Sequence, residues 1–167
     1  SLAQGGTKEL VIIADDISDE ALATFVVNKL RGGFNVLAIE APGFGDSQGD
    51  KLEDIATVVD AEVIAGDRGM SLDQATEAML GKAHKIIATE DKTTIVDGAG
   101  TKKGIQARAE KLRRQAENTD SDYTAEKLEK RAASLVGGVA VIRVGAATET
   151  EMKYLKLKIE DAVNATK

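Results

Sequence analysis

Residues 10–39, LVIIADDISDEALATFVVNKLRGGFNVLAI, decide the fold of this chain. Two apolar runs, at residues 10–14 and 35–39, flank a stretch that reads as a helix from about Ser18 to Leu30. Short continuous apolar runs are typical of strands that are buried on both faces. Acidic and serine residues precede the helix, and residues 31–33, Arg-Gly-Gly, end it. This segment therefore predicts a strand–helix–strand unit.

The same alternation continues downstream. The sequence predicts a helix over about residues 51–58, a short strand at residues 63–64, and a further helix opened by the capping box at residues 71–74. Residues 85–89 and 93–96 are expected to pair as a hairpin. Because strands and helices alternate, we expect an α/β sandwich around a mainly parallel sheet.

The second half of the chain has a mainly helical pattern. Apolar residues recur at helical spacing over residues 102–135, with a turn at residues 119–122, which predicts an antiparallel helical hairpin with charged outer faces. A glycine pair at residues 137–138 then precedes an expected strand at residues 139–142. A second capping box, at residues 148–151, opens a last predicted helix.

Composition limits the function classes. The 167 residues are 43% hydrophobic and 30% charged, with a net charge of −6, so no basic surface for nucleic acid is expected. There is no cysteine, which excludes disulfides and thiolate chemistry. The apolar runs are of strand length, so no membrane span is expected. No Met opens the chain and residues 161–167 still read as helix, so we expect a piece of a longer protein.

The helix of residues 18–30 carries too many apolar side chains. Phe25, Leu22, Val26, Leu30 and Val27 span an arc of roughly 200°, about twice what one core-facing stripe needs. Two interpretations remain open from these residues alone. Either the helix is covered on two sides, or part of its apolar face meets solvent and captures a partner.

The glycine-rich turn at residues 98–104 follows a strand and opens a helix, as a phosphate loop does. Its third glycine comes one residue late for a dinucleotide fingerprint, and the only candidate for the ribose-binding acid, Asp120, lies in the turn of the helical hairpin. An ordinary glycine-rich turn is favoured, and a small nucleotide-binding α/β enzyme is the alternative.

Other candidate chemistry is weak. His84 is the sole histidine and has no accompanying hydrolase or zinc motif. The acidic pairs at residues 15–16 and 53–54 are interpreted as cap and surface charges, and no ligand cluster for a metal is expected. Asp161 lies on the side of its helix opposite the apolar stripe. The local sequence indicates only a solvated carboxylate there.

Several collinear segments together resemble the group I chaperonins, the bacterial GroEL type. Singly each is weak, but their order along the chain is specific. They are residues 20–24 with 26–28, 41–46, 54–57, 93–98, 121–123 with 126–128, 137–142, and 144–149.

The resemblance implies a chaperonin apical-domain-like fold with a helical hairpin and a C-terminal intermediate-domain helix. Residues 1–138 would be a partial apical, polypeptide-binding domain. Residues 139–167 would hold the last apical strand and the hinge region that leads into a partial intermediate-domain helix. Of the first groove helix of that domain, only a tail at residues 1–3 would be present.

The family's apical domain binds polypeptide between two helices, and residues 18–30 resemble the second. The resemblance therefore favours an exposed apolar face over a doubly covered helix. Phe25 stands where the family usually has an aliphatic residue. By this match Leu22, Val26 and Val27 would be apolar contacts, with Thr24, Asn28 and Arg31 as polar contacts at the rim.

Further residues match other parts of the family's machinery. Gly137 and Gly138 match the hinge between the apical and intermediate domains, where glycine's loose backbone permits rotation. Glu149 matches an acidic residue of an inter-subunit salt bridge, and Asp161 matches the aspartate that promotes ATP hydrolysis. Without the nucleotide-binding equatorial domain, Asp161 is expected to be idle in this piece.

The resemblance thus implies a chaperone module that is no enzyme by itself. Its expected partners are non-native polypeptides, the mobile loop of the co-chaperonin, and neighbouring subunits of a heptameric ring, but neither nucleic acid nor membrane. ATP and magnesium would serve the intact parent, with no cofactor in this piece. The expected location is the bacterial cytoplasm, or alternatively a mitochondrial matrix or plastid stroma.

Overall fold

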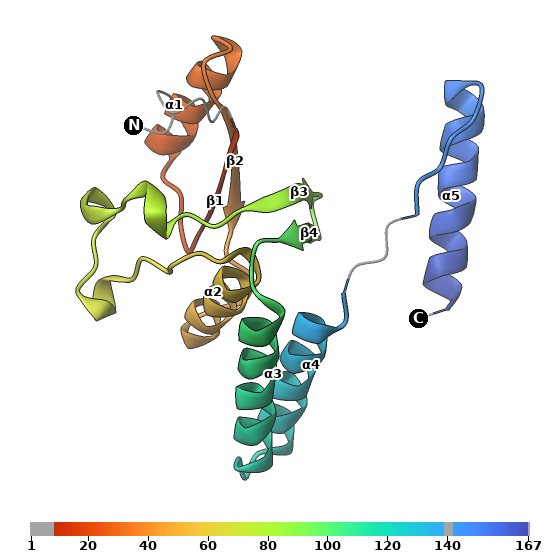
Figure 1. Cartoon of the computed structure of the whole chain (residues 1–167). Helices are drawn as coiled ribbons and strands as arrows, with labels where there is room; N and C mark the ends of the chain where they lie inside the picture. The colour runs from red at the N-terminus through yellow and green to blue at the C-terminus, as the bar shows by residue number, and fades with distance from the viewer. Residues whose placement is uncertain (1–8, 139–141, 167) are drawn as a thin grey trace.

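The computed structural model describes residues 9–138 and 142–166 (Figure 1). A strand–helix–strand unit comes first, a β-hairpin and a helical hairpin follow, and a last helix stands apart from them. The elements, in chain order, are β1 (Glu9–Ala14), α1 (Asp19–Leu30), β2 (Asn35–Glu40), α2 (Asp46–Val59), η2 (Gly66–Arg68), η3 (Leu72–Gln74), η4 (Glu77–Met79), β3 (Ala83–Ala88), β4 (Thr93–Gly98), α3 (Lys102–Glu117), α4 (Asp122–Val136) and α5 (Glu149–Ala165).

The first unit confirms the predicted strand–helix–strand segment. β1 and β2 pair in parallel, with Leu10 opposite Val36, and α1 packs on β2. Ser18 begins α1, because its side-chain oxygen accepts a hydrogen bond from the amide of Ala21 at 3.3 Å. Each feature follows from local sequence, which is why the prediction succeeds here.

The strands form two separate sheets rather than one. β3 and β4 pair antiparallel, as predicted for the hairpin, and the described residues contain two two-stranded sheets, one parallel and one antiparallel. The expected mainly parallel sheet is therefore not confirmed. The short connection between β3 and β4 can join only antiparallel strands. Although α2 lies between β2 and β3, within the described chain β3 pairs with β4 alone and does not extend the parallel sheet.

The segment between α2 and β3 departs from the prediction. Residues 63–64 form no strand, and residues 71–80 hold the 3₁₀ turns η3 and η4 in place of a helix. The Ser71 hydroxyl donates to Asp73 Oδ1 and accepts no backbone amide, so the capping box does not form.

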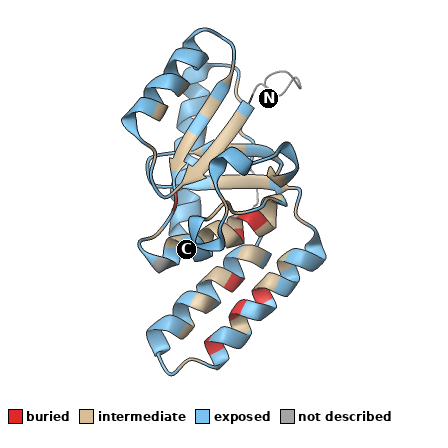
Figure 2. Ribbon diagram, turned by 90° about the vertical axis from the view of Figure 1, so that its left-hand side faces the viewer, coloured by how far each residue is buried: buried red, intermediate tan, exposed pale blue. Residues whose placement is uncertain are grey.

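The helical hairpin is confirmed and holds the tightest packing. Ala109 and Leu112 of α3 and Ala132 of α4 are buried against one another, with Leu128 and Leu135 packed beside them. Figure 2 shows these buried residues along the facing sides of the two helices. α1 and this hairpin lie at opposite ends of the molecule, with α2 between the strands and the hairpin (Figures 1 and 2).

The last helix, α5, begins at Thr148, whose hydroxyl accepts from the amide of Glu151 at 3.2 Å. Leu155 and Ile159 are half-buried and no residue of α5 is buried. The strand expected at residues 139–142 falls on residues 139–141, outside the described residues, and Ile142 lies in no strand. Within residues 9–138 and 142–166, no helix has the length and apolar character that crossing a bilayer requires.

Candidate functional site

α1 presents apolar side chains to solvent. None of its residues is buried, and Leu22, Val26 and Leu30 are 38%, 55% and 82% exposed. Their spacing of four residues places them in one stripe along the helix. Val27, 44% exposed, lies beside this stripe. We call these four residues the α1 apolar face.

The opposite side of α1 anchors the helix. Ala21 and Phe25 are its half-buried residues, and they lie roughly 120° around the helix axis from the stripe of Leu22, Val26 and Leu30. Since α1 packs on β2, Ala21 and Phe25 mark its packed side. The described chain covers only that side, so the interpretation of a doubly covered helix is wrong for this structure.

The three expected rim residues are all exposed on the same helix or at its end. The Thr24 hydroxyl donates to the carbonyl of Glu20 at 2.9 Å, and the Asn28 amide donates to the carbonyl of Thr24 at 2.8 Å. Both side chains are thus turned onto their own backbone. Arg31 caps the C-terminus and forms no ion pair within the described residues.

The remaining expected site residues lie far from α1. Gly137 ends α4 in a right-handed helical conformation, and Gly138 adopts φ +65°, which favours glycine. Glu149 pairs with Lys153 at 2.9 Å on the surface of α5. Asp161 is exposed on α5, and no group of three metal-ligating side chains occurs in the described chain.

The glycine-rich turn does not resemble a phosphate site in this structure. The amide of Ala99 donates to Lys82, that of Gly100 to Val58, and that of Gly104 to the Thr101 hydroxyl. These amides are therefore unavailable to a ligand. A hollow of about 240 Å³ does lie at this end of α3. Its charged lining is Glu53, Asp60, Glu62 and Arg68, and because Arg68 pairs with Glu53, the remaining acidic groups disfavour phosphate.

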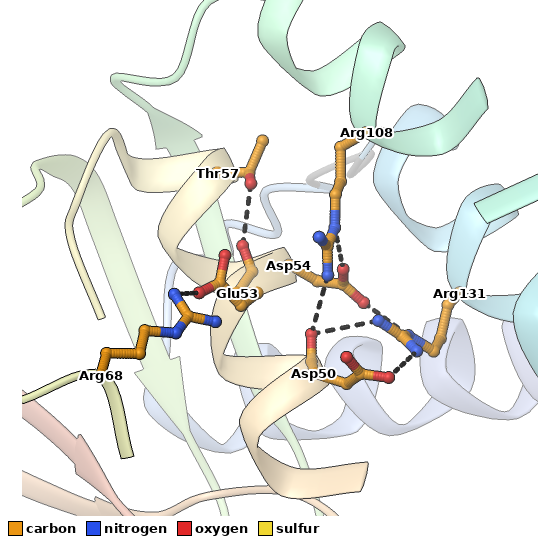
Figure 3. Close-up of polar contacts among 7 residues, drawn as sticks. All are labelled: Asp50, Glu53, Asp54, Thr57, Arg68, Arg108 and Arg131. Carbon is orange, nitrogen blue, oxygen red and sulfur yellow. Dashed lines mark hydrogen bonds and ion pairs between the residues drawn. The ribbon is translucent and has the colours of Figure 1, made fainter. Parts of the chain in front are cut away.

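Sequence reasoning missed a cluster of ion pairs between helices (Figure 3). Asp54 of α2 is only 9% exposed, so its interpretation as a surface charge is wrong. Its Oδ1 accepts from Arg108 Nε at 2.8 Å and its Oδ2 from Arg131 Nε at 2.7 Å. The partners lie 54 and 77 residues away along the chain, and no local pattern indicates such a contact.

Asp50, one turn earlier on α2, completes the cluster. Its carboxylate accepts from Arg131 Nη1 at 2.9 Å, and its main-chain carbonyl accepts from both Arg108 and Arg131. Burial alone would lower the pKa of Arg131, but hydrogen bonds and charge from Asp54 and Asp50 outweigh burial and raise that pKa. Two cations thus face two carboxylates. We call Asp50, Asp54, Arg108 and Arg131 the α2 brace.

Neighbouring Glu53 is engaged separately. Its carboxylate pairs with Arg68 of η2, and its carbonyl accepts from the Thr57 hydroxyl at 2.8 Å (Figure 3). Adjacent carboxylates of α2 therefore face different parts of the fold.

A comparison with known protein families matches nearly the full chain. Residues 2–167 match the family described as the TCP-1/cpn60 chaperonin family. The match covers nearly the full chain, including α1, the helical hairpin and α5. The chain therefore belongs to the TCP-1/cpn60 chaperonin family, the proteins that assist the folding of other proteins.

Proposed function

We propose that this chain is the apical, polypeptide-binding part of a group I chaperonin, and that the α1 apolar face captures non-native polypeptides. The observation that carries the proposal is the exposure of Leu22, Val26 and Leu30 on a helix whose other side is held by β2. Aliphatic side chains make no directional demand on a partner, so they suit segments of unrelated sequence.

The polar side chains of α1 support the same reading. Because the Thr24 hydroxyl and one N–H of the Asn28 amide already donate to their own backbone, these two donors stay paired when an apolar segment binds. Arg31 remains exposed beside Leu30 for a polar contact. The same face would receive the mobile loop of the co-chaperonin.

The size of the face predicts weak binding by a single copy. Full burial of one Leu or Val contributes about 1.5–3 kcal/mol, and the four side chains are already partly covered. Association costs about 4–15 kcal/mol in lost freedom. Tight capture therefore needs several copies acting together, as a heptameric ring provides.

The remaining assignments belong to the intact parent. We propose Gly137 and Gly138 as the hinge, Glu149 as an inter-subunit contact and Asp161 as the aspartate that serves ATP hydrolysis. The amides of Ala99 and Gly100, in the turn before α3, bond to Lys82 and Val58, which favours a packing role for that turn over a phosphate site. We propose that nucleotide binding belongs to another domain of the parent. The proposed location is the bacterial cytoplasm.

Substitution of Val26 by Ser tests the capture face. We expect Val26→Ser to weaken capture of an unfolded client about tenfold in the intact chaperonin, with unchanged thermal unfolding of this chain. Leu72→Ser is the matched control, because Leu72 is 80% exposed on η3, away from α1. Equal capture by Val26→Ser and the parent would refute the proposal. Heat of binding on titration of this chain alone with ATP or NAD would instead favour a nucleotide enzyme.

A further inference from the structure

The α2 brace is the polar join between α2 and the helical hairpin. α3 and α4 pack along each other far more extensively than either packs on α2, through a core of alanine and leucine. The last turn of α2 bonds to the turn before α3 through the amide of Gly100 and the carbonyl of Val58. Earlier along α2 the contact is made by the two arginines, whose side chains are only 15% and 16% exposed. Together with that main-chain contact at one end of α2, charged groups of fixed geometry help to set the orientation of the hairpin on α2.

Asp54 is the central member of the brace. Each of its two carboxylate oxygens accepts from a different helix, Oδ1 from α3 and Oδ2 from α4 (Figure 3). Both arginines also donate to the main-chain carbonyl of Asp50, which fixes them along the α2 axis. Losing the Asp54 charge would leave two mostly buried guanidinium groups without the carboxylate that they share.

The brace lies on a continuous path from the glycine pair to α1. Arg131 lies less than two turns of α4 before Gly137. From Asp54 the path runs along α2 to the loop after β2, where the amide of Ala41 donates to Ala14 of β1 at 2.8 Å. α1 packs on β2, so the path ends at the apolar face.

We infer that Asp54 is a positioning residue, which holds the α1 apolar face in a fixed orientation to the hinge-side helix α4 by bonding Arg108 and Arg131 at once. The inference rests on the proposed function for the roles of the hinge and of α1. With the brace intact, rotation at Gly137 and Gly138 carries α1 with it as one body. Without the brace, α4 rotates and α1 no longer keeps a fixed orientation relative to it.

A distance measurement tests this inference. The chain has no cysteine, so Ala23→Cys on α1 and Glu129→Cys on α4, both exposed, accept spin labels cleanly. Pulsed electron–electron double resonance then gives the distribution of distances between the two labels on α1 and α4. We expect Asp54→Asn to broaden this distance distribution at least twofold in samples frozen from a temperature at which circular dichroism shows native helix content. Asp54→Glu should partly restore the narrow distribution. An unchanged distribution in Asp54→Asn would overturn the inference.

Two further variants keep the test decisive. Glu126→Gln breaks an exposed pair with Lys130 on α4 and should leave the distribution narrow. Arg131→Lys retains the charge but loses the forked contact, and it replaces Asp54→Asn as the test if that variant does not fold. Broadening in Glu126→Gln equal to that in the brace variant would also refute the inference. Client capture by Val26→Ser is a separate readout, so the proposed function and the brace can fail independently.

Discussion

The amide of Gly100 donates to the carbonyl oxygen of Val58 at 2.9 Å, which joins the turn before α3 to the last turn of α2. The approach is close because Gly100 has no side chain. A Cβ atom built there would lie 2.1 Å from the carbonyl oxygen of Thr57. The glycine that suggested a phosphate loop is therefore required by packing.

Substitution of Gly100 by Ala should destabilise the chain. The added methyl group meets backbone rather than a flexible side chain, so α2 and α3 must move apart. We expect a loss of about 1–3 kcal/mol in the free energy of unfolding, measured by urea denaturation.

Gly49→Ala is the matched control for this prediction. Gly49 lies within α2, and a Cβ atom there meets nothing within 4 Å. Replacing a helical glycine by alanine should stabilise the chain by about 0.5–1 kcal/mol. Destabilisation by both substitutions would show that α2 itself, and not the contact with the turn, is sensitive.

Leu112 is the largest fully buried side chain of the described residues, at 1% exposed. Leu112→Ala removes the contact at the centre of the α3–α4 hairpin and leaves a cavity. We expect the free energy of unfolding to fall by about 2–5 kcal/mol, with the midpoint measured by circular dichroism. Leu157→Ala on α5, where Leu157 is 60% exposed, should change it little. A small effect of Leu112→Ala would mean that the hairpin unfolds independently of the measured transition.

The exposed pair of Glu126 and Lys130 gives a pH prediction. A hydrogen bond from Lys130 at 2.6 Å, and its charge, lower the pKa of the Glu126 carboxyl below its ordinary value. Because the folded pKa of Glu126 is lowered, the stabilisation from its ion pair with Lys130 is present above the pKa of the unfolded chain. That stabilisation is lost as the pH falls through the folded pKa. Lys130→Met should return the Glu126 pKa toward its ordinary value in a carbon-13 NMR titration.

Lys127→Met provides the control for that titration. Lys127 lies over the ring of Tyr123, with its ammonium 4.3 Å from the ring centroid. Its loss should therefore leave the Glu126 pKa below the ordinary value. A return to the ordinary value in Lys127→Met would assign the shift to the general field of α4 instead of the pair.

Local sequence predicted the elements whose causes are local. Ser18, Ser121 and Thr148 each cap a helix through a hydroxyl that accepts the amide three residues on, and this spacing is visible in the sequence. The apolar excess of α1 likewise predicted an exposed or doubly covered face. Choosing between those two required the structure, because only the neighbours of α1 decide which side is covered.

Features that depend on distant residues escaped prediction. The capping box at Ser71 did not form: the hydroxyl donates to Asp73 and accepts no backbone amide, and the chain turns into short 3₁₀ segments there. Asp54 was interpreted as a surface charge because its partners Arg108 and Arg131 lie on helices that no nearby residue places beside α2. The spacing of residues along the sequence predicts which side chains share a face of one helix. It does not predict contacts between helices, and the brace joins three of them.

The cap of α1 gives the last prediction. The Ser18 hydroxyl satisfies the amide of Ala21 in the first turn, and Ser18→Ala removes that acceptor. We expect a loss of about 1 kcal/mol, seen as faster amide hydrogen exchange in α1, while Ser18→Asp retains protection. Ser134→Ala is the control, since the Ser134 hydroxyl bonds back to Lys130 inside α4 and supplies no cap. Because the α1 apolar face needs an intact helix, Ser18→Ala should also weaken client capture, and full capture despite faster exchange would mean that the client itself orders α1.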